Sequence, residues 1–299
     1  MRGFTLVIVL TLLGTFTGCY YFGPCIDGSG PVVNEEREIR GFTGVKNTGS
    51  FDVYIESADE FHVEVRAQEN LVPIVETYIS GYTLYVKTKD GTCFRSSSPV
   101  EVHITMPELE VLTLSGSGRI FAESAQTDVF ECLNEGSGHL MIDTVHSRNF
   151  TASNSGSGLV RIKEVTANAV QLYESGSGTL DGGVIHGAGE LKIRHNSSGL
   201  VKAVLYAAAK LDATLNGSGK IELMGDATIA SYTLNGSGKV DAVEVMVGSV
   251  EATNTASGNI WVYATDFLEA TITGSGDIIY RGSPLLNYKI TGSGRVRKY

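Results

Sequence analysis

The tripeptide Gly-Ser-Gly returns along this chain at a nearly constant interval. Successive copies lie 20, 20, 20, 21, 20, 19, 20, 18 and 18 residues apart. This count includes two degenerate copies, Ser197-Ser198-Gly199 and Ala256-Ser257-Gly258. The complete copies begin at Gly116, Gly136, Gly156, Gly176, Gly217, Gly236, Gly274 and Gly292. Repetition at this period is typical of a solenoid, in which each unit buries its apolar side against its neighbours.

The residues around each copy alternate between apolar and polar, as expected of strands with one buried face. The position four residues after the start of each copy is always aliphatic: Ile120, Leu140, Val160, Leu180, Val201, Ile221, Val240, Ile260, Ile278 and Val296. Apolar residues also stand six and four positions before the start of each later copy, from Phe130 and Cys132 to Leu286 and Tyr288. We therefore predict an all-β fold, a right-handed parallel β-helix or β-solenoid. Its rungs hold about 20 residues, with Gly-Ser-Gly at a corner that needs close backbone approach.

The first residues read as an export signal. Arg2 precedes an apolar run from Phe4 to Leu13, and small residues then lead to Cys19. This arrangement resembles the lipobox of bacterial lipoproteins, and the run is too short to span a bilayer. We predict a signal peptide over residues 1–18, a lipid such as palmitate on Cys19, and a tether over residues 19–34. A cysteine that carries more than one acyl chain anchors a protein stably.

Residues 35–299 are predicted to form a single β-solenoid domain, with atypical rungs over 35–110 and regular repeats over 111–299. Thr48-Gly49-Ser50-Phe51 matches the repeat register and predicts an outlying rung, and Leu71 to Ile79 predicts a short helix capped by Asn70. Atypical end units are expected, because the end of an apolar column must be covered. Strands are expected at Val45–Asn47, Phe51–Glu56, Phe61–Arg66, Tyr82–Lys87 and Val100–Met106.

Three cysteines remain after Cys19. Cys132 falls on an inward position and is expected to be a small buried hydrophobe. Export permits a disulfide between Cys25 and Cys93, but two cysteines 68 residues apart leave the pairing open. The cysteine spacing does not fit a zinc site.

Several of these features together resemble a known family. They are the lipobox, the start of the outlying rung, the segment Glu69-Asn70-Leu71, the strand that ends in Met106-Pro107, and Leu114-Ser115 before the first Gly-Ser-Gly. With them the chain resembles the putative auto-transporter adhesin, head GIN domain family of bacterial envelope proteins, over residues 35–299. The resemblance implies a Gram-negative envelope and an adhesin-type role, and it brings no catalytic residues.

Composition and spacing argue against two other functions. The net charge is −10, without a basic stripe, so nucleic-acid binding is not expected. The six histidines are dispersed and are expected at the surface or at edges, and no metal or cofactor is predicted. A polysaccharide lyase or hydrolase needs acids gathered on neighbouring rungs. Here Asp181, Glu222 and Asp241 alternate with Lys202, which is typical of a solvated face.

One outward face is a candidate for recognition. Three positions before the tripeptide, four consecutive rungs carry threonine, and one position before it they carry asparagine or threonine. This candidate ligand face consists of Thr214, Thr233, Thr253, Thr271, Asn216, Asn235, Thr255 and Thr273, and Tyr173 and Trp261 are outward aromatics that could add stacking. An exposed sheet also favours such residues without any ligand. The central serines of the tripeptides are interpreted as a corner device.

These observations predict a lipid-anchored outer membrane lipoprotein, facing the periplasm or the cell surface. Its role is expected to be non-enzymatic binding or adhesion, with the membrane as one partner and a glycan or surface ligand as another. Two alternatives stay open: a carbohydrate-active β-helix enzyme, and a periplasmic structural or stress-response accessory. The sequence identifies neither the ligand nor the oligomeric state.

Overall fold

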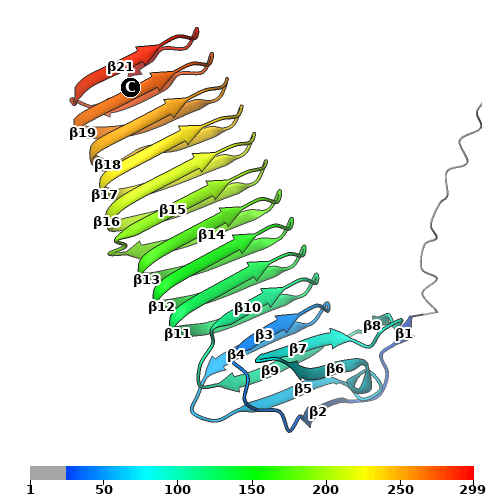
Figure 1. Cartoon of the computed structure of the whole chain (residues 1–299). Coiled ribbons are helices and arrows are strands. Elements are labelled where there is room, and N and C mark those ends of the chain that lie inside the picture. The colour runs from blue at the N-terminus through cyan, green and yellow to red at the C-terminus, as the bar shows by residue number, and fades with distance from the viewer. Residues whose placement is uncertain (1–24) are drawn as a thin grey trace, which may run out of the picture.

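The computed structural model describes residues 25–299 and shows an all-β solenoid (Figure 1). The predicted signal peptide and Cys19 lie outside these residues. Parallel strands stack along the axis of the molecule, as the repeat predicts. The array is built from β10 (Val111–Leu114), β11 (Arg119–Asn134), β12 (His139–Asn154), β13 (Leu159–Glu174), β14 (Thr179–His186), β15 (Glu190–His195), β16 (Leu200–Leu215), β17 (Lys220–Leu234), β18 (Lys239–Asn254), β19 (Asn259–Ile272), β20 (Ile278–Gly282), β21 (Leu285–Ile290) and β22 (Val296–Lys298).

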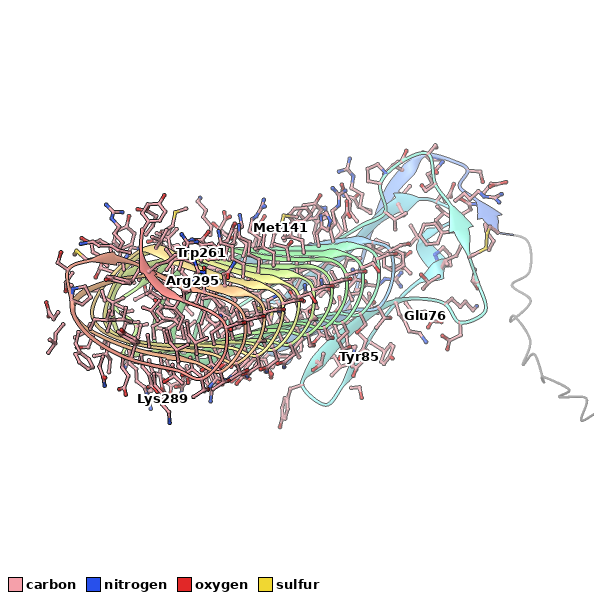
Figure 2. The ribbon with its side chains drawn as sticks, turned by 90° about the horizontal axis from the view of Figure 1, so that it is seen from above. Glu76, Tyr85, Met141, Trp261, Lys289 and Arg295 are labelled. Atoms are coloured by element: carbon pink, nitrogen blue, oxygen red, sulfur yellow. A yellow bond between two sulfur atoms is a disulfide. The ribbon has the colours of Figure 1, made fainter. Side chains whose placement is uncertain are left out.

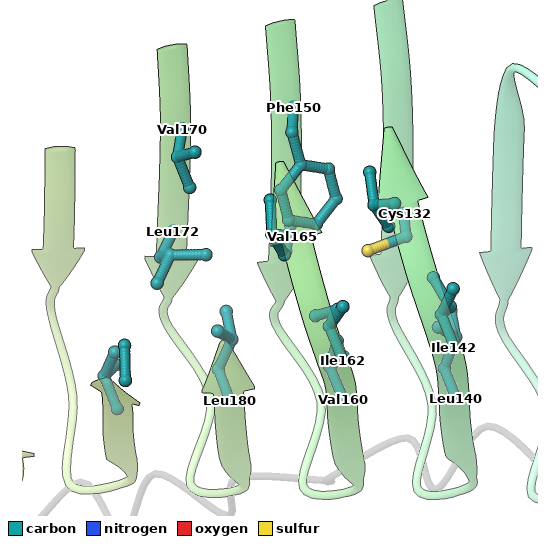
Figure 3. Packing of buried hydrophobic residues seen from close by; sticks show 14 of the residues in the cluster. Cys132, Leu140, Ile142, Phe150, Val160, Ile162, Val165, Val170, Leu172 and Leu180 are labelled. Atoms are coloured by element: carbon teal, nitrogen blue, oxygen red, sulfur yellow. The ribbon is translucent and has the colours of Figure 1, made fainter. Parts of the chain in front are cut away.

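Equivalent side chains of consecutive rungs lie on top of one another in the interior. Ile120 pairs with Leu140, which pairs with Val160 and then with Leu180, and all four are fully buried. Figure 3 shows part of this packing, with Leu140 next to Val160 and Cys132 in the same core. The predicted aliphatic column is therefore present. Cys132 is buried and free, and burial raises the pKa of its thiol.

At the Gly-Ser-Gly corner, the backbones of successive rungs lie very close together. A Cβ atom at Gly136 or Gly156 would overlap the carbonyl oxygen of the glycine one rung below, Gly116 or Gly136. Glycine is required here because its backbone can approach another rung that closely. The backbone is paired at the same place, since the N–H of Gly138 donates to the carbonyl of Gly116 at 3.3 Å.

The opposite bend of the rungs is looser. Register shifts occur between Asp181 and Val184, between Leu205 and Ala208, and between Glu222 and Met224. Two more occur in the pairing of β18 with β19. The bend thus absorbs the variation in repeat length, and the corner stays in register.

A column of buried polar side chains lies just before the corner: Asn47, Asn134, Asn154, Glu174, His195 and Asn254. Most of them hydrogen-bond the backbone that turns around them. Asn134 Nδ2, for example, donates to the carbonyl of Gly138 at 3.1 Å, and Asn134 Oδ1 accepts from the N–H of Gly136 at 3.2 Å. His195 is fully buried here with Nε2 2.8 Å from the carbonyl of Gly199, so the expectation that every histidine lies at the surface or at an edge is wrong for this residue.

The N-terminal residues extend the stack and then close it. Strand β3 pairs in parallel with β10, and β4 pairs with β11. The turn Thr48–Ser50 therefore lies directly beside Gly116, as the outlying rung predicts. Antiparallel strands finish the cap, because β5 pairs with β9 and β2, and β6 pairs with β7. The cap strands are β1 (Ile26–Asp27), β2 (Val32–Glu36), β3 (Gly44–Asn47), β4 (Asp52–Ser57), β5 (His62–Gln68), β6 (Val75–Ser80), β7 (Thr83–Thr88), β8 (Phe94–Arg95) and β9 (Glu101–Met106).

The helix predicted over Leu71 to Ile79 is wrong. Only a single 3-10 turn, Val72–Ile74, forms there, and β6 follows it at once. Pro73 and the β-branched residues disfavour a longer helix, and Gly81, with φ +63°, turns β6 back onto β7. Asn70 does not cap a helix, because its side chain bonds the backbone of Asp27 and Ser29.

The disulfide that the sequence left open is present between Cys25 and Cys93. Strand β1 pairs with β8 beside it, and β2 pairs with β5. The part of the predicted tether from Cys25 onward is therefore ordered structure, because the disulfide and the pairing of β1 and β2 hold it against the fold. Within residues 25–299, no helix is long and apolar enough to cross a membrane.

Candidate functional site

The four threonines of the candidate ligand face form one continuous row. Thr214 pairs with Thr233, Thr233 with Thr253, and Thr253 with Thr271, on β16 to β19. All four are partly exposed. Their hydroxyls make no hydrogen bond to another described residue, so they are free to bond solvent or a ligand.

The neighbouring row of amides behaves differently, because its members hydrogen-bond one another. Asn235 Nδ2 donates to Asn216 Oδ1 at 2.8 Å, and Thr255 Oγ1 donates to Asn235 Oδ1 at 2.8 Å. The row begins one rung earlier than the sequence indicated, since Asn216 Nδ2 donates to Asn196 Oδ1 at 2.7 Å. This ladder fixes the edge of the face and ends at Thr255, and Thr273 on the next rung is an exposed residue.

A shallow hollow lies beside the threonine row on the same strands, which the sequence did not reveal. It has a volume of about 270 Å³ and is lined by Ile229, Phe267 and several polar residues. Ile229 is 46% exposed. Glu251 and Glu269 stand at its border, next to Thr253 and Thr271. Hydroxyls, an aromatic ring and carboxylates therefore meet on one sheet face.

The serine corner forms a second, longer groove of about 690 Å³. Its rim includes Ser218, Ser237 and Trp261, and Ser237 Oγ donates to Ser218 Oγ at 3.1 Å. Lys239 Nζ lies 4.0 Å from the centre of the Trp261 ring, which covers one face of that ring. The other outward aromatic, Tyr173, bonds Gln171 through its hydroxyl. Both predicted aromatics are therefore held by neighbours within the fold.

On the opposite sheet face several outward charges are paired. Asp181 is bound by Arg161 and Lys202, at 3.2 and 3.1 Å. Lys239 and Asp241 form another pair at 2.7 Å. This is the solvated, charge-paired face that the alternating signs predict.

Three acids on consecutive rungs near the cap were not expected from the sequence. Glu56, Glu123 and Asp143 follow the outward row of Tyr54, Phe121 and Met141, and together they line a hollow of about 450 Å³. Tyr54 stacks on Phe121 with ring centres 5.1 Å apart. Glu56 and Glu123 become neighbours only because β4 pairs with β11, although the paired residues lie 67 positions apart in the sequence. No local sequence pattern reveals this pairing. Figure 2 shows Met141 and Trp261 on the same side of the molecule.

Among residues 25–299, no group of three or more His, Cys, Asp or Glu side chains is placed to hold an ion. The three missed acids are all exposed on an open sheet. The strongest features of the surface are therefore rows of repeated polar side chains.

The fold and these rows define a repeat protein that presents long, regular outward faces. Residues 41–203 and 184–284 match the family described as "Putative auto-transporter adhesin, head GIN domain", and the chain belongs to this family. Among curated proteins, none matches the chain significantly.

Several solved structures share the fold. A putative lipid binding protein from Parabacteroides distasonis is 24% identical, with a TM-score of 0.56, and the match covers 92% of this chain and 100% of that one. A putative adhesin from Parabacteroides merdae is 21% identical, with a TM-score of 0.55, and covers 93% and 100%. A putative adhesin from Parabacteroides distasonis is 22% identical, with a TM-score of 0.51, and covers 92% and 100%.

Proposed function

We propose that the protein is a lipid-anchored, non-enzymatic binding module of the bacterial cell envelope, with an adhesion-type role. The observation that carries this proposal is the row of four threonines whose hydroxyls have no partner within the described structure. Membership of a family described as putative adhesins supports it. The rival role, a periplasmic structural or stress-response accessory, needs no such row.

The geometry of the face favours a ligand with repeating hydroxyl groups. Strand pairing sets a spacing of about 4.8 Å between neighbouring threonines. Each rung thus offers one methyl and one hydroxyl at a fixed interval. Phe267 supplies an apolar contact beside the row, and Glu251 and Glu269 can accept hydrogen bonds from a ligand. A glycan chain matches this combination, and we propose glycans as the ligand class.

The binding test uses the chain from Tyr20 onward, without lipid, so that Cys25 keeps its disulfide. On a glycan array this protein is expected to bind a defined set of glycans. The double change Thr233→Val and Thr253→Val should weaken binding at least tenfold, since valine keeps the shape and loses the hydroxyl. Thr151→Val on β12, partly exposed but outside the face, is the matched control. A blank array, or equal loss in the control, would count against the face.

Anchoring and location are separate parts of the proposal. The lipobox motif before Cys19 supports lipidation, and the Cys25–Cys93 disulfide fits an oxidising compartment outside the cytoplasm. Cells fed a clickable palmitate analogue are expected to label the protein, and Cys19→Ala should abolish the label. Protease treatment of intact cells distinguishes the two locations, because a surface adhesin is cleaved and a periplasmic accessory is not.

A carbohydrate-active enzyme remains a second candidate because of the three acids on consecutive rungs. Paired carboxylates are what glycoside cleavage requires. If this candidate holds, the protein releases new reducing ends from a polysaccharide, and Glu123→Gln abolishes that release. Binding without release, in both forms, supports the non-enzymatic role.

A further inference from the structure

The two ends of the solenoid differ in how the core is closed. At the N-terminal end, Phe42, Phe51 and Leu71 are buried at 0%, 0% and 1% exposure under the cap strands. At the C-terminal end no described residue lies over the last rung, β21 and β22 (Figure 1). Among residues 25–299, the core is therefore uncovered at this end.

Side chains of the core columns emerge at this open end. Leu268, Ala270 and Ile272 are each fully buried. Their partners one rung later are Leu286, Tyr288 and Ile290. Tyr288 is 58% exposed and Ile290 is 37% exposed, although they occupy inward positions. These side chains lack only the next rung, which in the array would cover them.

The backbone of the last rung also has unused pairing capacity. Strand β21 pairs only with β19, and β22 pairs only with β20, so each has one free edge among the described strands. A free edge presents a row of N–H and C=O groups that a further strand can bond. An extended polypeptide can match these alternating N–H and C=O groups along the whole edge, and a lipid surface cannot. The edge therefore favours a polypeptide as the occupant.

Charge selects among polypeptide occupants. Residues 278–299 contain five basic residues and no Asp or Glu: Arg281, Lys289, Arg295, Arg297 and Lys298. Arg281 and Arg297 already pair with Glu244 and Asp277, at 3.2 and 3.0 Å. Lys289, Arg295 and Lys298 have no ion-pair partner among the described residues, so this end is positive on a chain whose net charge is −10. Figure 2 shows Lys289 and Arg295 on opposite sides of the end. Two copies meeting through this end would place like charges together, which disfavours self-pairing.

We propose that the C-terminal end is a docking site for an extended acidic segment of a partner protein, which adds as the next rung along the free edges of β21 and β22. The segment contributes apolar side chains over Leu286, Tyr288 and Ile290, and carboxylates beside Lys289 and Arg295. Lys289 lies in register beside Thr271, the last threonine of the row, but Leu286, Tyr288 and Ile290 are not part of the threonine face, so peptide binding and glycan binding can fail separately.

A peptide with the sequence of residues 267–280 is the probe. In the chain this segment already stacks against Leu285–Lys298 from the other side, so it has the shape of a neighbouring rung. It contains Glu269 and Asp277 and no basic residue. The control peptide replaces both acids with lysine. Fluorescence anisotropy with the chain from Tyr20 onward is expected to show saturable binding of the acidic peptide, at least tenfold tighter than of the control.

Two protein variants locate the contact. Ile290→Lys places a charge at the uncovered end of the core and should weaken binding of the acidic peptide at least tenfold. Val129→Lys is its matched control, because Val129 is an exposed apolar residue on β11, far from the end. Lys289→Glu keeps the apolar surface and should reverse the preference between the two peptides. Circular dichroism confirms that each variant folds.

Hydrogen exchange supplies an independent readout. Amides of β21 and β22 should exchange more slowly with the acidic peptide bound. The proposal is overturned if the peptide does not bind, if Ile290→Lys has no effect, or if protection appears elsewhere. It is also overturned if sedimentation shows a concentration-dependent oligomer that Ile290→Lys dissolves, because the occupant is then a second copy of this chain.

Discussion

Individual buried polar residues decide how this repeat departs from an ideal one. Glu174 occupies a position that asparagine fills on the two rungs before it. Its carboxylate accepts hydrogen bonds from Asn154 Nδ2 at 2.8 Å and from the N–H of Gly176 at 2.9 Å. Burial nevertheless raises the pKa of Glu174 to about 7, since the two hydrogen bonds offset the loss of water only in part.

Glu174 makes the stability of the protein depend on pH. The pKa in the folded state lies above that in the unfolded chain, 4.5, so this residue favours folding at low pH. That contribution, roughly 3 kcal/mol, is lost as pH rises from about 4.5 to about 7. Glu174→Gln lacks this titration, so the difference in the free energy of unfolding between the wild type and the variant should change across this pH window. Denaturant melts of both proteins at pH 4.5, 6 and 8 measure the difference, and a constant difference would contradict the prediction.

Tyr232 is a buried residue whose hydroxyl has no hydrogen-bond partner. Its ring fits because its neighbours in the column, Ala213 and Ala252, are small. Tyr232→Phe removes the unsatisfied hydroxyl and should raise the free energy of unfolding by about 1 kcal/mol. Tyr232→Ala should instead cost about 3 to 5 kcal/mol, because it leaves a cavity. Thermal melts of the wild type and the two variants measure these differences. A phenylalanine variant less stable than the wild type would show that a water satisfies the hydroxyl.

Within each rung, the corner and the bend differ in how well they tolerate changes in sequence and length. The corner holds carbonyl oxygens against the Cα atoms of the next rung, and the bend accommodates register shifts. The strictness of the tripeptide in the sequence therefore reflects a backbone contact that recurs on every rung, whereas at the bend a comparable contact occurs only on some rungs, at Gly183, Gly225 and Gly282.

Gly156→Ala tests the corner directly. Its new Cβ would overlap the carbonyl of Gly136, so the rungs must separate locally. We expect a loss of about 2 to 4 kcal/mol in the free energy of unfolding. Ser155→Ala, at the exposed residue just before it, should change stability by less than about 0.5 kcal/mol. Equal effects of the two changes in urea titrations would mean that the corner is not the tight point.

The array could be predicted from the sequence because its signals repeat at a fixed distance. The inward columns and five of the nine cap strands, β3, β4, β5, β7 and β9, could also be predicted from local alternation, to within two residues, whereas β1, β2, β6 and β8 could not. Leu71 to Ile79 was misread because a short apolar run fits both a helix and a strand, and only pairing with β7 decides between them. The burial of His195 and the acids at Glu56 and Glu123 depend on which rungs become neighbours.

At the scale of the molecule, one end is closed by a covalently fastened cap. The Cys25–Cys93 disulfide links β1 to the segment before β8, and Asn70 ties the same region through its side chain. The hydrophobic cluster runs without a break from Phe42 in the cap to Ile278 in the last rungs. Cap and array therefore share one core.

Removal of the disulfide should loosen the cap first. The bond closes a loop of 68 residues, for which chain entropy predicts about 4 kcal/mol of stabilisation. The double variant Cys25→Ser and Cys93→Ser is expected to become sensitive to proteases within residues 25–110 while the array stays resistant. Limited proteolysis with mass spectrometry locates the cuts. Cleavage spread evenly along the array would show that the cap and the array unfold together.

The loose bend has a consequence for how such a molecule can change over time. Insertions and deletions of a few residues are absorbed there without disturbing the opposite corner. Evolution can therefore lengthen or exchange these segments rung by rung while inheriting the same scaffold. A protein engineer can do likewise, grafting foreign loops at the bend as a regularly spaced display.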